Sequence, residues 1–513
     1  DNWIWPRHTG DFALFRIYAD TDNEPAPYNE SNKPYSPARH LKVSLDGADE
    51  GDFVMVYGFP GRTQQYLISD AVDYVISTSN PLKIKMRETS LAIIDKAMAA
   101  DDKTRIQYAS KQARISNAYK KWIGQNFGLK RYNALGKKKE FENEFQEWLK
   151  SDNDAMSRYG TLIDDLKRAQ NDAEKYQMAR EMFIEYVYYG PEFYRLASRF
   201  NNLKNNYTDL LESGELGSTL ESLKRAVSKH FKDYDIKVDL DVFKALTPMY
   251  LNNLDSDLLP EFFRSEYGSK YRSSPSLLGT RLYGSSMFTS EEKLLDFLDS
   301  FSEKSLKALD KDLGFRLMDD VYDVYFNTVR PELALKNNRI DKLMRNFVLA
   351  QQEMIPEKMF WSDANSTLRL TYGKVEGSKP RDGVEYLSHT TLDGVISKYQ
   401  PGHADFDLPQ KLLDLHSEGA YGRYADEDGE LYVCFTGSNH TSGGNSGSPA
   451  LDADGNLIGL NFDRSWESTM SDIMFSPELC RNIMVDIRYV LFIVDKFAGA
   501  GHLIDEMEIV SKK

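Results

Sequence analysis

The chain has 513 residues and a formal net charge of −15, with 28% charged and 12% aromatic residues, as in ordinary globular proteins. A chain of this length can bury a sizeable core and holds two or three domains. The acidic balance argues against nucleic acid or an anionic membrane as the main partner, and no apolar run reaches the roughly 18 residues of a membrane span.

The first 75 residues carry a β pattern. Short runs rich in β-branched and aromatic residues occupy positions 12–18, 41–45 and 53–57, with turn-forming stretches between them. A Gly-Phe-Pro-Gly sequence at residues 58–61 closes this section, because glycine and proline favour a turn. We therefore expect this section to form part of a β domain.

Helical periodicity replaces the β pattern over residues 76–365. Thr289 and Glu292 have the spacing of a capping box, and Gly190-Pro191 and Thr247-Pro248 are expected to end helices. Three apolar stripes, whose members recur at steps of three or four residues, predict amphipathic helices. Their members are Phe141, Phe145, Trp148 and Leu149; Met178, Met182, Phe183 and Tyr186; and Leu294, Leu295, Leu298 and Phe301.

The β pattern returns in the last part of the chain. Runs at residues 366–372, 431–436, 457–462 and 483–486 predict strands, and an amphipathic stretch over 487–497 predicts a C-terminal helix. The order β, long α, β is most simply that of a helical domain inserted in a β domain. The sequence therefore predicts an α+β fold.

A serine between glycines, in Gly443-Gly444-Asn445-Ser446-Gly447, is the strongest candidate for chemistry. Glycine allows a tight turn, in which the N–H groups of Gly444 and Ser446 can converge on one oxyanion. Ser446 is therefore a candidate peptidase nucleophile. The alternative is a glycine-rich hairpin in which the serine is incidental.

A serine nucleophile needs a general base, and no histidine fits that role well. His8 lies only three residues from Asp11, and His440 lies on the same loop as Ser446, whereas triad partners generally come from separate strands. Neither histidine is assigned as the base.

Two other patterns bear on metals and redox state. Acidic turns at residues 20–22, 426–429 and 452–455 lack the glutamate that ends an EF-hand loop, and the last two are better explained as hairpin turns. Cys434 and Cys480 could pair in an oxidising compartment, but sequence alone leaves their geometry open. No metal and no organic cofactor is expected.

Three ordered blocks, at residues 2–12, 57–63 and 443–449, resemble the bacterial dipeptidyl peptidases 7 and 11. They read Asn-Trp-Ile-Trp-Pro-Arg-His-Thr-Gly-Asp-Phe, Tyr-Gly-Phe-Pro-Gly-Arg-Thr and Gly-Gly-Asn-Ser-Gly-Ser-Pro. The family consists of serine exopeptidases of the chymotrypsin clan. The resemblance is strongest to the type that is specific for Asp and Glu.

The resemblance implies a chymotrypsin-like double β-barrel with a large helical insertion. Residues 1–75 would be a β segment of the peptidase domain, 76–365 an inserted helical cap, and 366–513 the second barrel with the nucleophile, the specificity pocket and a C-terminal helix. The family's catalytic histidine precedes the Asn-Trp motif and matches no residue of this sequence. We therefore expect the first barrel to be largely absent and this chain alone to be inactive.

The resemblance assigns Ser446 as the nucleophile and Asp11 as the triad carboxylate. It implies that Asn2, Trp3 and Asp463 hold the free amino group of the substrate, since a carboxylate and an amide oxygen satisfy an ammonium. Arg464 would line the specificity pocket and pair with an acidic substrate side chain. Alternatively, Arg464 pairs with Asp463 or Glu467 and faces solvent.

The implied function is release of dipeptides from peptides with a free N-terminus and Asp or Glu as the second residue. The resemblance further implies a homodimer in the periplasm or at the cell surface of a Gram-negative bacterium. Two alternatives are a chymotrypsin-like endopeptidase, which would not need an amine site, and a catalytically inactive helical interaction fragment.

Overall fold

The computed structural model describes residues 2–403 and 405–511, which form two compact units. Unit 1 comprises Asp1–Tyr66, Gly124–Tyr132 and Trp361–Lys513, and unit 2 comprises Leu67–Ile123 and Asn133–Phe360. Helix α3 (Asp102–Arg131) contributes residues to both units. This division differs from the one expected from the sequence, in which residues 124–132 lie inside the helical domain.

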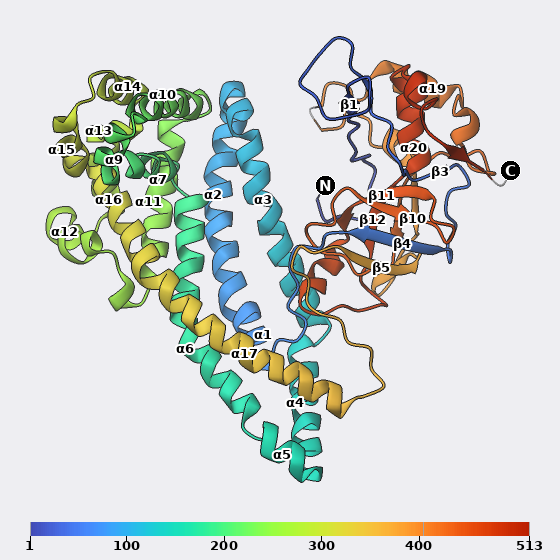
Figure 1. The fold of residues 1–513 in the computed structure, drawn as a ribbon, viewed down its shortest axis with the longest axis horizontal. Helices are drawn as coiled ribbons and strands as arrows, with labels where there is room; N and C mark the ends of the chain where they lie inside the picture. The colour runs from blue at the N-terminus through green and yellow to red at the C-terminus, as the bar shows by residue number, and fades with distance from the viewer. Residues whose placement is uncertain (1, 404, 512–513) are drawn as a thin grey trace. The chain divides into compact units, whose positions relative to one another are not determined.

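Unit 1 is built around a nine-stranded, mostly antiparallel sheet, whose central strands lie side by side in Figure 1. The strand order is β5-β4-β10-β11-β12-β9-β8, and β3 pairs in parallel with β11 and β13. The strands of unit 1 are β1 (Tyr18–Ala19), β2 (Lys33–Pro34), β3 (Val43–Ser44), β4 (Phe53–Gly58), β5 (Arg369–Lys374), β6 (Ser378–Arg381), β7 (Val384–Tyr386), β8 (His389–Thr391), β9 (Tyr432–Gly437), β10 (Ser448–Leu451), β11 (Leu457–Arg464), β12 (Asn482–Asp486) and β13 (Ile509–Val510).

The sheet buries side chains on both faces. In β12, Ile483 and Val485 pack in one core with Phe492, whereas Met484 packs in a second core with Phe435 on the other face. Because successive strand residues point to opposite faces, a slip of one residue would exchange the two cores. This packing fixes the register of β11, which pairs with β12 and ends at Arg464.

Short helical segments accompany the sheet. They are α18 (Leu392–Ile396), α19 (Gln410–Ser417), η7 (Gly422–Tyr424), η8 (Trp466–Asp472), α20 (Ile487–Phe492), η9 (Ile493–Phe497) and η10 (Gly501–Leu503). The C-terminal helix predicted over 487–497 is confirmed as α20 and η9, and the strands predicted at 53–57, 366–372, 431–436, 457–462 and 483–486 correspond to β4, β5, β9, β11 and β12.

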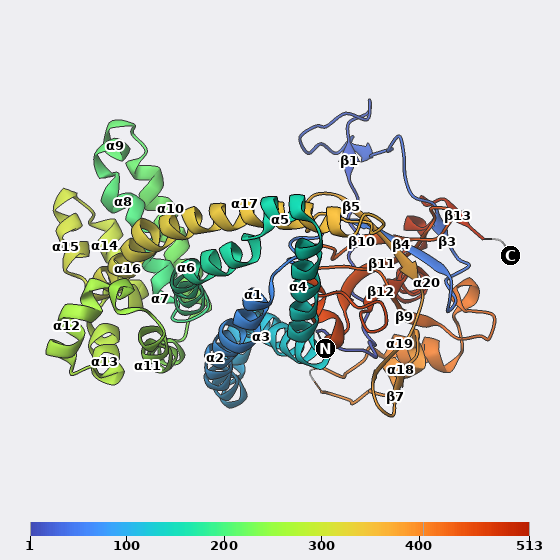
Figure 2. The same ribbon diagram turned by 90° about the horizontal axis from the view of Figure 1, so that it is seen from below.

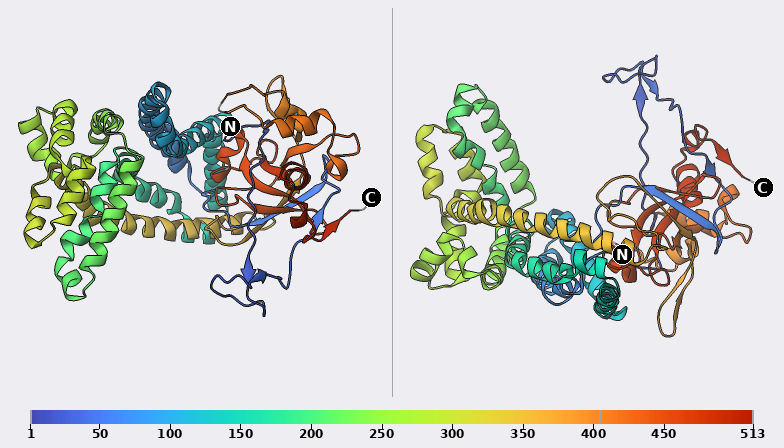
Figure 3. Two further views of the ribbon diagram at one scale, coloured as in Figure 1. Left: turned by 90° about the horizontal axis from the view of Figure 1, so that it is seen from above. Right: turned by 60° about the horizontal axis from the view of Figure 1, so that its bottom comes forward.

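The strand predicted at residues 12–18 is wrong. Only its last residue is in a strand, in the two-residue β1, which pairs with β2 (Figure 3). Phe12 packs against a core of unit 1, but Phe15 is 91% exposed and Ile17 is 68% exposed, so most of this run faces no core within the described residues. A strand needs a neighbour to accept its backbone hydrogen bonds, and most of this run has none there.

Unit 2 is helical throughout its described length, and α6 and α17 pack against each other (Figures 1 and 2). Its helices are α1 (Ser69–Asp73), α2 (Asn80–Ala100), α4 (Ala134–Ser151), α5 (Asn153–Tyr159), α6 (Leu162–Phe183), α7 (Phe193–Ser198), α8 (Asn201–Asn205), α9 (Tyr207–Glu212), α10 (Leu216–Lys232), α11 (Ile236–Asn252), α12 (Glu261–Tyr271), α13 (Pro275–Ser285), α14 (Glu291–Asp299), α15 (Leu306–Lys311), α16 (Leu313–Asp323), α17 (Arg330–Met354) and part of α3, joined by short 3₁₀ and π turns. None of the described helices combines the length and apolarity needed to cross a membrane.

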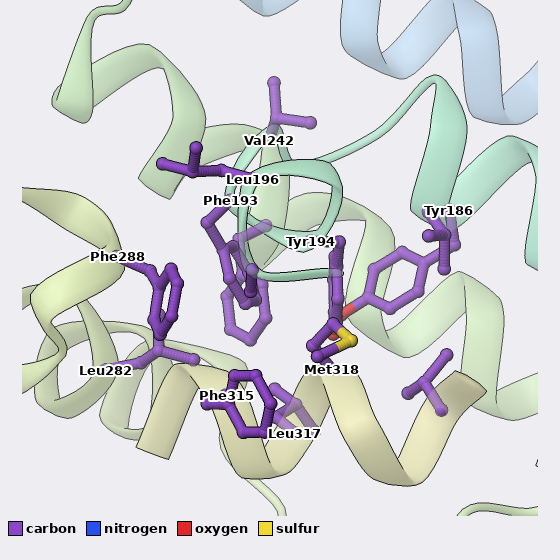
Figure 4. Packing of buried hydrophobic residues seen from close by; sticks show 14 of the residues in the cluster. Tyr186, Phe193, Tyr194, Leu196, Val242, Leu282, Phe288, Phe315, Leu317 and Met318 are labelled. Carbon is purple, nitrogen blue, oxygen red and sulfur yellow. The ribbon is translucent and has the colours of Figure 1, made fainter. Parts of the chain in front are cut away.

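Aromatic side chains fill the main core of unit 2. Figure 4 shows Phe193, Tyr194, Phe315 and Met318 gathered in this core, and all four are fully buried. The second and third predicted apolar stripes contribute to the same core, and the first stripe packs in a smaller one. The helical prediction for these three stretches is therefore confirmed.

Two local predictions in this region are wrong. Pro248 does not end a helix but lies inside α11, where the buried side chains of Phe243, Leu246 and Tyr250 hold the helix in the core despite the lost hydrogen bond. The N-cap of α14 is Ser290, whose hydroxyl accepts from the Lys293 N–H, and not Thr289.

Candidate active site

Ser446 lies on the loop between β9 and β10, with its side chain exposed. The loop is held by neighbouring backbone: the Gly447 N–H donates to the carbonyl oxygen of Asn461 at 2.7 Å, and the buried Asn445 side chain accepts from the Ser442 N–H at 3.0 Å. Ser446 Oγ donates to the carbonyl oxygen of Phe462 at 3.3 Å. A rigid loop therefore presents an accessible hydroxyl.

Gly444 provides the conformation that the loop needs. Its φ is +108°, and a Cβ at this position would lie 2.5 Å from the carbonyl oxygen of Phe59, so only glycine fits. Within the described residues, neither the Gly444 N–H nor the Ser446 N–H donates a hydrogen bond to another group. Two unpaired donors flank the hydroxyl, as an oxyanion site requires.

Arg464 is buried at the end of β11, with its side chain 4% exposed. Its Nη1 donates to Asp472 Oδ1 at 2.8 Å, to Ser471 Oγ at 2.7 Å and to the carbonyl oxygen of Thr441 at 3.2 Å. The alternative in which Arg464 pairs with Asp463 or Glu467 and faces solvent is therefore wrong. The ion pair with Asp472 fixes one edge of the guanidinium.

The other edge of the guanidinium is free. Arg464 Nη2 and Thr441 Oγ1 are buried and have no hydrogen-bond partner among the described residues. The ring of Trp3 faces the guanidinium, with its centroid 5.4 Å from Arg464 Cζ. Leaving such donors unpaired costs free energy, and a carboxylate in this position would remove that cost.

Asp463 links the N-terminal segment to β11. Its carboxylate accepts from the Trp3 N–H at 2.9 Å and from the Arg464 N–H at 2.8 Å, and it forms an ion pair with Arg7. The Asp463 and Arg7 side chains are 10% and 5% exposed. The structure thus brings together three of the predicted residues, Trp3, Asp463 and Arg464.

The side chains of the other predicted residues form no hydrogen bond or ion pair with this cluster in the described part of the chain. Asn2 and Asp11 are exposed, and neither forms a hydrogen bond or ion pair with Ser446 in the described part of the chain. His440 Nε2 lies 2.9 Å from the carbonyl oxygen of Ser471, and burial lowers the pKa of His440. Burial also lowers the pKa of His8, whose ring lies against Gly394. In the described structure neither histidine bonds to Ser446.

Three residues at this site were not found from the sequence. Arg7 lies within the matched N-terminal block, so its position could have suggested a role. Ser471 and Asp472 carry no such signal, because their contact with Arg464 depends on how η8 folds back after β11. In the folded chain both residues are buried.

The described residues contain no cluster of side chains able to hold a metal ion. Cys434 and Cys480 are both buried and free. Burial raises the pKa of both thiols, to about 11 for Cys480, so neither resembles a reactive thiolate at neutral pH.

Comparison with known proteins gives consistent results. The model of the family described as Peptidase S46 matches residues 1–509. The chain is 44% identical over 513 residues to the Asp/Glu-specific dipeptidyl-peptidase of Flavobacterium psychrophilum, covering 100% of this chain and 70% of that protein. It is 38% identical over 515 residues to dipeptidyl-peptidase 7 of Phocaeicola vulgatus, covering 99% of this chain and 70% of that protein.

A solved structure is also similar. Porphyromonas endodontalis DPP11 in complex with the dipeptide Arg-Glu matches with a TM-score of 0.85 and 33% identity, over 99% of this chain and 71% of that chain. The same protein in complex with Arg-Asp matches with a TM-score of 0.86 and 32% identity, over 99% of this chain and 72% of that chain.

Proposed function

The chain belongs to the peptidase S46 family, and from this premise we propose that it is a serine exopeptidase that releases dipeptides whose second residue is Asp or Glu. The names of its relatives support dipeptide release. One relative, which is 44% identical to this chain, is named an Asp/Glu-specific dipeptidyl-peptidase. The free edge of Arg464 is the observation that carries the acidic preference.

Ser446 acts as the nucleophile in this proposal. Its hydroxyl attacks the scissile carbonyl as the general base takes the proton, and the N–H groups of Gly444 and Ser446 stabilise the oxyanion. The C–N bond then breaks as the protonated base gives that proton to the leaving amine, and water hydrolyses the acyl-enzyme to release the dipeptide and regenerate Ser446. The exposed hydroxyl and the two unpaired N–H groups support these roles. Asp11 orients the general base that takes the proton. Neither His8 nor His440 forms a hydrogen bond to Ser446 among the described residues, so neither is proposed as that base.

Asp463, Asn2 and Trp3 form the subsite for the substrate amino group. Three donors already bind the Asp463 carboxylate, and a carboxylate has about four acceptor positions, so one position remains for an ammonium. A substrate that continued beyond this point would bury charge without a partner, which disfavours internal cleavage. This subsite limits the product to two residues.

Arg464 selects the acidic side chain. Its Nη1 is held by Asp472, while Nη2 and the Thr441 hydroxyl are free to donate to a substrate carboxylate. Such charge-assisted hydrogen bonds are strong and planar, as a guanidinium favours. An apolar substrate side chain would leave both donors buried and unpaired, so it would be rejected.

Finer features follow from the same family resemblance. We propose a chymotrypsin-like double β-barrel for the peptidase domain, supported by the antiparallel sheet in which β9 and β10 flank the nucleophile loop. The helical insertion is proposed as a cap. A homodimeric state and a periplasmic or cell-surface location rest on the resemblance alone.

The test is a change of selectivity in the Arg464→Gly variant of the full-length protein, with Arg39→Gly, at an exposed arginine of unit 1, as the matched control. We expect kcat/KM for Asp and Glu dipeptide reporters to fall about 10- to 100-fold relative to an apolar reporter, because a hydrogen bond to a charged group contributes about 1.5–3 kcal/mol. An unchanged preference for acidic reporters would reject the assignment. Cleavage of N-acetylated reporters at the same rate would favour an endopeptidase.

A further inference from the structure

Unit 2 contains a cavity of about 540 Å³, formed by residues of α2, α3, α7, α10 and α11, helices that Figure 1 labels. This volume lies in the range of sites for small molecules. Its buried wall is partly apolar, with Leu196, Val238 and Val242, and partly polar, with Tyr108 and Glu192. The proposed active-site residues all belong to unit 1, so this cavity is a separate feature.

Positive charge dominates the cavity lining. Three carboxylates line it, those of Glu192, Asp233 and Asp239. The cationic side chains are twice as many: Lys111, Arg114, Arg195, Arg199, Arg225 and Lys229. The chain as a whole carries a net charge of −15, so this excess is local and does not reflect a generally basic surface.

Internal donors already bind the two buried carboxylates. Glu192 accepts from Lys111 Nζ at 2.8 Å and from the Tyr108 hydroxyl at 3.0 Å. Asp239 accepts from the hydroxyls of Tyr283 at 2.8 Å and Tyr234 at 3.1 Å. Glu192 also forms an ion pair with Arg195 at 3.7 Å, so the buried acidic groups are satisfied within unit 2.

Four of the cations have no ion-pair partner among the described residues: Arg114, Arg199, Arg225 and Lys229. All four line the cavity and are exposed. By contrast Lys224, adjacent to Arg225 on α10 but outside the lining, pairs with Glu221 and Asp299. Unpaired cations around one opening concentrate the field that attracts an anion.

Two polar atoms deeper in the lining also lack partners. Arg195 Nε and His230 Nε2 are buried and form no hydrogen bond within the described residues. Burial lowers the pKa of His230 to about 4, so its ring is neutral at pH 7 and one ring nitrogen can donate. An anionic oxygen entering the cavity would satisfy these groups, since an unpaired buried donor costs free energy.

We propose that this cavity binds a small polyanion, a molecule that carries at least two phosphate or carboxylate groups. Guanidinium groups bind both kinds of oxyanion in a bidentate manner. Several cations around one cavity favour clustered anionic oxygens over a single charge. Tripolyphosphate serves as the probe for ligands with phosphate groups, and citrate as the probe for ligands with carboxylate groups.

Isothermal titration calorimetry on the full-length protein tests the proposal at constant ionic strength. We expect saturable binding of tripolyphosphate, citrate or both, with one site per chain. The Arg199→Gln/Arg225→Gln double variant should weaken binding at least about tenfold, because each loses charged hydrogen bonds. The Arg272→Gln/Arg281→Gln double variant removes the same charge from two exposed positions of unit 2 outside the lining, and it should leave binding unchanged.

The outcomes separate the alternatives. Binding of tripolyphosphate alone identifies a phosphate-bearing ligand, and binding of citrate alone identifies a polycarboxylate. No saturable binding of either probe would overturn the proposal. Binding that the double variant leaves intact would also overturn it, because an anion held at Arg464 in unit 1 would behave in that way.

Discussion

At the scale of single residues, Asp463 combines a structural and a proposed functional role. Its ion pair with Arg7 is almost fully buried, and its remaining acceptor position is proposed for the substrate ammonium. Removing one member of a buried pair leaves the other charge without compensation. The two roles can be separated, because only the structural one depends on Arg7.

We predict that Asp463→Asn lowers stability by about 3 kcal/mol in urea unfolding and kcat/KM for free-amine substrates by about 100-fold. Asp428→Asn, the same change at an exposed turn of unit 1, is the control. The double variant Asp463→Asn/Arg7→Met should regain stability without regaining activity. Recovery of activity in the double variant would show that Asp463 has no part in binding the amine.

Asp239 gives unit 2 a dependence on pH. Burial and the neighbouring Glu192 raise the pKa of Asp239 to about 7, from an ordinary value of 3.8. Between about pH 4 and pH 7, the folded protein therefore keeps a proton on Asp239 that the unfolded chain has already released. The stability from this group is fully present below about pH 4 and is lost as the pH rises through about 7.

We predict that Asp239→Asn abolishes this loss of stability at rising pH, because an asparagine side chain cannot ionise. The Tm of the variant minus that of the wild-type protein should increase steadily from pH 4 to pH 8. The exposed Asp209→Asn of the same unit should give a flat difference. A flat difference for Asp239→Asn as well would mean that this carboxyl titrates normally.

Sequence reasoning at the residue scale reached the groups that motifs carry. Ser446 and Gly444 were named from a short glycine-rich block and Asp463 and Arg464 from the end of the strand that follows it, although their roles remain proposals. Asp472 could not be found, because its ion pair with Arg464 depends on the path of η8. Contacts of this kind are properties of the folded chain and leave no local pattern.

At the scale of elements, the C-terminal end of α3 supports η8. A Cβ on Gly124 would lie 2.6 Å from Thr469 Oγ1 and 2.9 Å from the carbonyl oxygen of Trp466, and one on Gly128 would lie 3.0 Å from Met470. These glycines let α3 pack closely on the segment that carries Ser471 and Asp472. The anchor of Arg464 therefore depends on a helix far away in the sequence.

We predict that Gly124→Ala lowers the preference for acidic reporters, since η8 must shift to admit the new methyl group. Overpacking of this kind costs about 1–3 kcal/mol, more than the roughly 1 kcal/mol that alanine gains in a helix. Gly217→Ala in α10, where no atom lies within 4 Å of the added Cβ, should keep selectivity and stability. Equal selectivity in the two variants would refute the link between α3 and Arg464.

Periodicity correctly predicted five strands of the main sheet, three helical stripes and the C-terminal helix, and its failures have physical causes. The correct predictions follow from buried faces, which periodicity detects. Most of the stretch at residues 12–18 is exposed and only Phe12 packs against a core of the described residues, whereas Pro248 is tolerated because the buried face of α11 outweighs one hydrogen bond. Tertiary packing decided both cases.

At the scale of the whole molecule, the chain divides into two units with separate cores. Unit 1 holds every proposed catalytic and specificity residue, and unit 2 holds the basic cavity. The order β, α, β could be predicted from the sequence because the hydrophobic period changes near residues 76 and 366. The assignment of residues 124–132 to unit 1 could not, since these residues keep a helical period throughout α3.

The path of α3 has a consequence for how such a protein can be recombined. An exchange of residues 67–360 between relatives would transfer not only the helical unit but also the glycines that support η8. The helical unit is thus not a self-contained module, and a chimaera made at those boundaries inherits the donor's support for Arg464. We expect such a chimaera to acquire the donor's selectivity together with the donor's helical unit.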